Sequence, residues 1–296
     1  MLLTPPGREE AIRNIIRAAG EGRFHDKTEP LDPVLSPEEL SVRIHDHIRR
    51  MHSPASRLKN LIARGIAEIW RWRYSVGTDR IEGAEKLEGI RGGAFLTSNH
   101  FNPFDNGVIR TLSRETGHGR LWALSQGTNF VMPGLNGFML RHSDVIPLLR
   151  DPSYMAGPMR EMMRKVLDKK HFILIYPEQE MWFNYRKPRP GKRGAYLFAA
   201  EMGVPVIPCF VQMEDLPGRD SAGWQQIALV LHVLDPIWPD PAKTPRQNSF
   251  EMCMKDYAAK RAAYEKAYGR PLNYDFDLRD IAGWQVSPPA GTGSGR

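Results

Sequence analysis

A histidine and an aspartate separated by four residues are the side chains in this sequence best suited to acid–base chemistry. His100 and Asp105 lie in the segment 95–105, which reads FLTSNHFNPFD. An imidazole can take the proton of a hydroxyl as that hydroxyl attacks a carbonyl. A carboxylate on its Nδ1 fixes the tautomer, leaves Nε2 available and stabilises the imidazolium that forms. The pair therefore predicts general-base activation of a substrate hydroxyl.

The flanking residues predict a strand, a bend and a helix that would position this pair. An apolar strand over Ala94–Thr97 precedes His100, which falls in the bend. Asn102 is a suitable helix N-cap and Pro103 a suitable first helical residue, which places Asp105 in the first turn. Open α/β sheets bind ligands at the carboxyl ends of such strands. The alternative is that Asp105 only complements the helix dipole and the histidine is structural.

Short apolar runs alternate with helical stretches along most of the chain. The runs that we predict as strands are Ala94–Thr97, Asp144–Leu149, Phe172–Tyr176, Pro205–Val211 and Ile227–Leu234. The predicted helices lie near Pro103–Thr116, Gly157–Lys169, Arg193–Met202 and Asn248–Tyr268. Apolar strands separated by helices are typical of sheets covered on both faces and joined by right-handed crossovers. We therefore expect an α/β fold with a largely parallel central sheet flanked by helices and an N-terminal helical extension.

Changes in sequence texture predict three parts. Residues 1–77 form an extension whose helices face a membrane, residues 78–285 the α/β domain, and residues 286–296 a disordered tail rich in Pro, Gly and Ser. Within the extension, residues 1–35 are expected to be loose, with one short helix around Arg8–Ala19. Ser36 and Glu39 form a capping box for a second helix.

Composition narrows the class of protein and its surroundings. The chain has 296 residues, a formal net charge of +7 and two cysteines. We find no secretory signal and no apolar run near the roughly 18–20 residues that span a bilayer. Two cysteines make no disulfide framework and no metal cluster, so we expect no metal and a reducing cytoplasm. The positive charge favours an anionic partner: lipid headgroups, phosphorylated substrates or nucleic acid.

Four segments, in order, resemble the motifs of the glycerolipid acyltransferase family, which includes lysophosphatidic acid and glycerol-3-phosphate acyltransferases. They are Asn99-His100 with Asp105, Val145–Arg150, Tyr176-Pro177-Glu178 and Val204–Pro208, within a resemblance that covers about Asp79–Pro236. The resemblance implies acyl transfer to the hydroxyl of a lysophospholipid such as 1-acylglycerol-3-phosphate. The acyl donor would be acyl-CoA or acyl-ACP as co-substrate, with no other cofactor.

The resemblance also implies substrate-binding residues, for which structural alternatives remain. Asn99 belongs to the first motif, and Arg150 matches the arginine that holds the acceptor's phosphate; its alternative is a solvated side chain or an ion pair with Asp151. Glu178 matches a glutamate of the acceptor-binding loop. It could instead form a structural ion pair, perhaps with Arg150.

The third motif departs from the family pattern. The usual continuation Gly-Thr-Arg-Ser is replaced by Gln-Glu-Met-Trp at 179–182, so the family's arginine is missing. We predict that basic residues farther along, Lys192 above all, supply that charge. The alternative is a solvated basic loop. The candidates are Arg186, Lys187, Arg189, Lys192 and Arg193.

A helix from about Ala55 to Val76 carries an apolar stripe, basic residues and the cluster WRWRY at 70–74. Aromatic and basic side chains favour the interface of an anionic bilayer. We therefore expect a cytoplasmic protein peripheral on the inner face of the cell membrane. The alternative is an ordinary amphipathic helix packed on the core.

Two other functions remain open. The chain could be a hydrolase that passes the acyl group to water, although a Gly-x-Ser-x-Gly nucleophile elbow is absent. It could also be a non-catalytic lipid- or nucleic-acid-binding protein, although no phosphate loop or nucleic-acid motif supports that, and we expect no nucleic-acid partner.

Overall fold

The computed structural model describes residues 7–30, 35–75, 80–103, 105–149, 151–220 and 223–284. The side chains of Pro37 and of residues 70–75 are outside that description. So are Arg150 and the whole predicted tail, 286–296.

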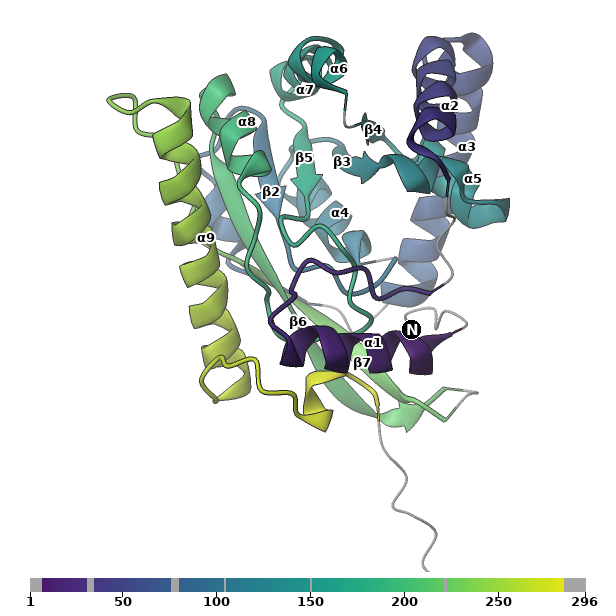
Figure 1. The fold of residues 1–296 in the computed structure, drawn as a ribbon. Coiled ribbons are helices and arrows are strands. Elements are labelled where there is room, and N and C mark those ends of the chain that lie inside the picture. The colour runs from purple at the N-terminus through teal and green to yellow at the C-terminus, as the bar shows by residue number, and fades with distance from the viewer. Residues whose placement is uncertain are drawn as a thin grey trace, which may run out of the picture.

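Within these residues a seven-stranded sheet forms the centre of the molecule (Figure 1). Its strand order is β1-β7-β6-β2-β5-β3-β4, and every neighbouring pair is parallel except β6 with β7. The α/β class and the largely parallel sheet are thereby confirmed. The strands are β1 Arg80–Glu82, β2 Ala94–Thr97, β3 Leu121–Gln126, β4 Val145–Leu148, β5 Phe172–Ile175, β6 Val206–Arg219 and β7 Gln225–Val233.

Helices cover both faces of the sheet, which explains why β2 and β5 are apolar and buried at every position. One face packs against α4 through Val108 and Ile109, and the other against α7 and α8 through Met159 and Ala199. The helices are α1 Arg8–Gly20, α2 Pro37–Arg50, α3 Pro54–Ser75, α4 Asn106–Glu115, α5 Gly134–His142, α6 Pro152–Ala156, α7 Pro158–Asp168, α8 Gly194–Met202 and α9 Pro245–Tyr268. Short 3₁₀ turns span Ala84–Leu87, Gly127–Val131 and Leu278–Asp280.

The register of the central strands brings two loops to one edge of the sheet. β2 pairs with β5 so that Thr97 lies opposite Ile175, at the carboxyl end of both strands. His100 therefore leaves the sheet three residues after β2, beside Tyr176, which directly follows β5.

Helix α1 is not part of a loose extension. Its buried residues Ala11, Ile12 and Ile15 pack in one cluster with Trp182 and Ile281, far along the chain. In Figure 1 α1 lies apart from α2 and α3, near the long strands β6 and β7. The prediction of a loose stretch is therefore wrong for residues 7–30. The apolar face of α1 is buried, and burial of such a face stabilises a helix.

The helices α2 and α3 of the predicted extension are present, and the capping box of Ser36 and Glu39 begins α2 as expected. Among the residues that the structure describes, none of the helices is both long and apolar enough to cross a membrane.

Candidate active site

The loop between β2 and α4 differs in one detail from the expected strand–bend–helix. Helix α4 begins at Asn106, so Asp105 occupies the N-cap position and Asn102 lies in the loop before it. Asp105 makes no side-chain cap bond to the helix. Its carboxylate turns back onto the loop instead, where it accepts bonds from the backbone N–H groups of Phe101 at 3.0 Å and Asn102 at 3.3 Å. The aspartate thus organises the bend that carries the histidine.

The predicted pair of His100 and Asp105 is in contact. Nδ1 of His100 lies 2.8 Å from Oδ2 of Asp105. The histidine side chain is 21% exposed, whereas the aspartate side chain is almost fully buried. Burying a carboxylate is costly unless its oxygens accept hydrogen bonds, and the loop supplies them. The arrangement leaves Nε2 as the ring nitrogen able to take a proton from a bound hydroxyl.

Tyr176 is a third member of this site that the sequence did not identify. Its hydroxyl donates to Oδ1 of Asp105, the oxygen that His100 does not use. Its ring stacks on the imidazole of His100, with centroids 3.9 Å apart and an angle of 13° between the planes. Burial and the charge of Asp105 raise the pKa of Tyr176 well above its usual value, so its hydroxyl remains a donor. The only sequence signal was its place at the start of the third motif.

Glu178 is buried in an ion pair, and its partner is Arg189. Nη2 of Arg189 lies 2.8 Å from Oε2 of Glu178, and the backbone N–H of Arg189 donates to Oε1 at 2.8 Å. The backbone N–H of His100 also donates to Oε2, at 3.2 Å. Burial lowers the pKa of Arg189 and the Glu178 carboxylate opposes that shift. Arg150, the partner suggested from the sequence, lies outside the described residues.

Most of the basic run after the third motif is internal. Arg186 pairs with Asp215 at 2.6 Å and Lys187 with Asp280 at 2.7 Å, and both basic side chains are buried. The alternative of a solvated basic loop is therefore wrong for these residues and for Arg189. Lys192 and Arg193 are exposed.

Lys192 lies directly beside the third motif, because its backbone N–H donates to the carbonyl of Pro177 at 2.8 Å. Its charge also helps to lower the pKa of His25, after the larger effect of burial. Of the basic residues at 186–193, Lys192 and Arg193 are thus the two whose exposure suits a substrate phosphate.

The side chain of Asn99 binds the backbone of β6. Its Nδ2 donates to the carbonyl of Val211 at 3.0 Å, and its Oδ1 accepts from the N–H of Val211 at 2.8 Å. The buried amide thereby continues the pairing of β2 with β6 beyond Thr97. A substrate-binding role for Asn99 stays a prediction.

In the described part of the chain, no group of three His, Cys, Asp or Glu side chains is placed to hold a metal ion.

A family model matches the part of the chain that holds this site. No curated protein matches the chain. The crystal structure of the 1-acyl-sn-glycerophosphate (LPA) acyltransferase PlsC from Thermotoga maritima is similar over 90% of this chain and 100% of that chain, with 15% sequence identity and a TM-score of 0.47. Residues 79–212, which contain His100, Asp105 and Glu178, match the family model described as Acyltransferase. The segment 79–212, which holds the candidate base and its partner, is therefore similar to the acyltransferase family.

Proposed function

We propose that this protein moves a fatty acyl group from acyl-CoA or acyl-ACP to the hydroxyl of a lysophospholipid such as 1-acylglycerol-3-phosphate, in phospholipid biosynthesis. The observation that carries the proposal is the 2.8 Å contact between Nδ1 of a partly exposed His100 and the buried carboxylate of Asp105. This is the geometry that a general base for a hydroxyl requires.

The proposed reaction is a direct transfer without a covalent enzyme intermediate. Nε2 of His100 takes the proton of the acceptor hydroxyl while the hydroxyl oxygen attacks the thioester carbonyl. The C–S bond then breaks, and the imidazolium returns its proton to the leaving thiolate. Asp105 stabilises the imidazolium between these two steps. Backbone N–H groups at the start of α4 are the candidate donors to the oxyanion.

For the acceptor's phosphate we propose Lys192, with Arg193 beside it. Both are exposed cations next to the third motif, which lacks the family's arginine. A lysine binds phosphate as a point charge on a flexible stem, so it does not need the geometry of the missing guanidinium. Arg150, which matches the family's phosphate-binding arginine, stays a candidate for the same phosphate and lies outside the described residues.

We further propose that α3 rests on an anionic membrane surface. Leu58, Leu61 and Ile69 are 59%, 60% and 62% exposed, on a helix that also presents exposed Arg57 and Lys59. Exposed apolar side chains with basic neighbours are typical of interfacial helices. The aromatic residues 70–74, on which the sequence argument relied, have side chains outside the described residues.

Vesicle flotation tests the membrane contact. Leu58→Glu combined with Leu61→Glu is expected to release the protein from vesicles containing anionic lipid. Phe250→Glu is the matched control, since Phe250 is a similarly exposed apolar residue on α9, on the other side of the molecule in Figure 1. Equal flotation of both variants and the unaltered protein would contradict the proposed surface.

Product analysis tests the reaction. Purified protein is incubated with a labelled acyl thioester, with and without 1-acylglycerol-3-phosphate. The proposal predicts label in a diacyl product and little release of free fatty acid. Free fatty acid formed at the same rate without the lysolipid would instead identify a hydrolase.

A further inference from the structure

The backbone of His100 is held from both sides by one buried ion pair. Its N–H donates to Oε2 of Glu178 at 3.2 Å, and its carbonyl accepts from Nη2 of Arg189 at 3.4 Å. Arg189 and Glu178 are in turn joined by contacts of 2.8 and 3.0 Å. We propose that Glu178 and Arg189 are positioning residues that fix the peptide of the catalytic histidine, and that Glu178 does not bind the acceptor.

Hydrogen-bonding capacity supports this assignment. A carboxylate offers about four acceptor sites. In Glu178 these serve the N–H of His100, the N–H of Arg189 and the guanidinium of Arg189. The side chain is also almost completely buried. Oε1 accepts one of these donors and keeps a second acceptor site, but an acceptor hydroxyl could reach it only by entering the packed interior around this side chain.

Arg189 reaches the site from outside the family motif. Besides Glu178 and His100, its guanidinium donates to the carbonyls of Phe24 at 2.9 Å and of Glu180. It also lies over the ring of Trp182, 4.4 Å from the centroid. A planar fork with five donors suits this set of contacts, and a lysine offers only three donors from one point. The guanidinium therefore links the N-terminal segment and the third-motif loop to the histidine.

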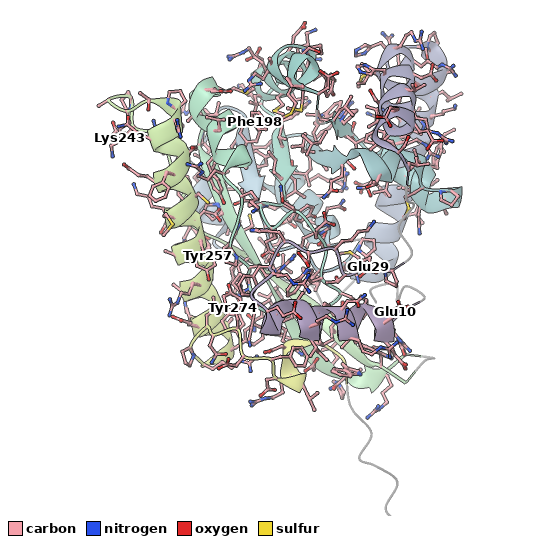
Figure 2. All side chains as sticks on the ribbon, viewed as in Figure 1. Glu10, Glu29, Phe198, Lys243, Tyr257 and Tyr274 are labelled. Carbon is pink, nitrogen blue, oxygen red and sulfur yellow. The ribbon has the colours of Figure 1, made fainter. Side chains whose placement is uncertain are left out.

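The segment that carries Arg189 is itself anchored. Lys187 binds Asp280 and donates to the carbonyl of Asp275, both at 2.7 Å. The hydroxyl of Tyr274 donates to the carbonyl of Pro188 at 2.7 Å and shares a second hydrogen bond with Tyr257. Figure 2 labels both tyrosines, one on α9 and the other on the segment that follows it. The contacts to His100 thus start from a rigid support, which a positioning role requires.

Kinetics with matched variants test the proposal, and this arm rests on the proposed function. Arg189→Lys keeps the buried charge but loses the fork, and Glu178→Gln loses the charge at nearly constant volume. Each is expected to lower kcat about tenfold or more while KM for donor and acceptor stays within about twofold, because misplaced catalytic groups slow the chemical step without weakening binding. Arg160→Gln is the control: it breaks a half-buried ion pair with Glu201, between α7 and α8, that contacts neither His100 nor the segment of Arg189.

Two kinetic results would overturn the proposal. One is a wild-type kcat in Arg189→Lys. The other is an acceptor KM that rises in Glu178→Gln with kcat unchanged, which would make Glu178 an acceptor-binding residue. Each rate is divided by the fraction of the protein that is folded, so that a general loss of stability does not change the comparison.

Amide hydrogen exchange provides an arm that does not depend on activity. The His100 amide is expected to exchange at least about tenfold faster in Glu178→Gln than in the unaltered protein, since its acceptor is weakened. Arg160→Gln should leave that exchange rate unchanged. Slow exchange in both variants would overturn the positioning role even if the acyltransferase reaction is established. Failure of the proposed reaction would leave this arm unaffected.

Discussion

The ring of Tyr176 lies parallel to the imidazole of His100, and its hydroxyl binds the same aspartate that binds the histidine. Asp105 is therefore shared between two partners, one on each carboxylate oxygen. This links the first and third motifs of the family in one hydrogen-bonded unit.

Tyr176→Phe separates the two contacts of Tyr176, because it removes the hydroxyl and keeps the stacked ring. Hydrogen bonds to charged groups contribute about 1.5–3 kcal/mol, so we expect kcat to fall about 10- to 150-fold with KM unchanged. Steady-state kinetics of the folded variant provide the measurement.

Tyr185→Phe is the matched control for that experiment. The Tyr185 hydroxyl is buried and has no hydrogen-bond partner within the described part of the chain. Removing it should leave kcat unchanged. Equal effects of the two substitutions would show that the Tyr176 hydroxyl has no special role.

Asp105→Asn tests the orienting partner of the histidine. The amide cannot accept from both ring and backbone donors as the carboxylate does, and it favours the wrong imidazole tautomer. By analogy with the serine protease triad, we expect kcat to fall about 10³- to 10⁴-fold with the fold retained. Circular dichroism and steady-state kinetics provide the measurements. Asp151→Asn, which alters the half-buried N-cap of α6, should keep its activity.

Lys192→Glu tests the proposed phosphate contact. Reversing the charge of an exposed residue beside the third motif should raise the KM for a phosphorylated acceptor about tenfold or more and change kcat little. Lys169→Glu, at an exposed position after α7, is the control for net charge. An acceptor KM that changes equally in both variants would exclude a specific contact at Lys192.

The surroundings of His142 predict that the folded protein loses stability in acid. Burial, followed by the charges of His47 and Lys59, lowers the pKa of His142 to about 4. Its Nδ1 lies 2.9 Å from Oδ1 of Asn60, and its ring lies 5.9 Å from that of His47, so it joins α5 to α3 and α2. The unfolded chain, with an ordinary histidine pKa near 6.5, binds the proton first as pH falls. Stability is therefore complete above about pH 6.5 and decreases towards pH 4.

Urea unfolding between pH 7 and 4.5 measures this effect. The linkage gives at most about 3 kcal/mol from this one group. His142→Gln should flatten the pH dependence of the unfolding free energy, whereas substitution of the exposed His52 should not. Identical slopes for the two variants would contradict the assignment to His142.

The sequence predicted the local part of this site better than its long-range part. The pair of His100 and Asp105 lies within five residues, and a strand followed by a helix start is enough to bring it together. Tyr176 contacts Asp105 across 71 positions, and Arg189 contacts His100 across 89. Those contacts depend on which strands are neighbours, a property of tertiary structure that residue spacing does not encode.

The elements that were missed have related causes. Strand β3 begins with only four apolar residues, Leu121–Leu124, before the polar Ser125 and Gln126, and a run that short is a weak strand signal. Helix α5 is short and begins at a glycine. The stretch 21–30 looks polar and loose in sequence, yet Thr28 and Asp26 bind the third-motif loop through hydrogen bonds of 3.1 and 3.0 Å.

The most direct test of the account is the rate of acyl transfer by His100→Ala, measured with a labelled acyl thioester and 1-acylglycerol-3-phosphate. The account predicts that the purified wild-type protein forms the diacyl product. It also predicts that the variant, folded to the same extent by circular dichroism, loses nearly all turnover. Transfer by His100→Ala at the wild-type rate would contradict the assignment of His100 as the catalytic base.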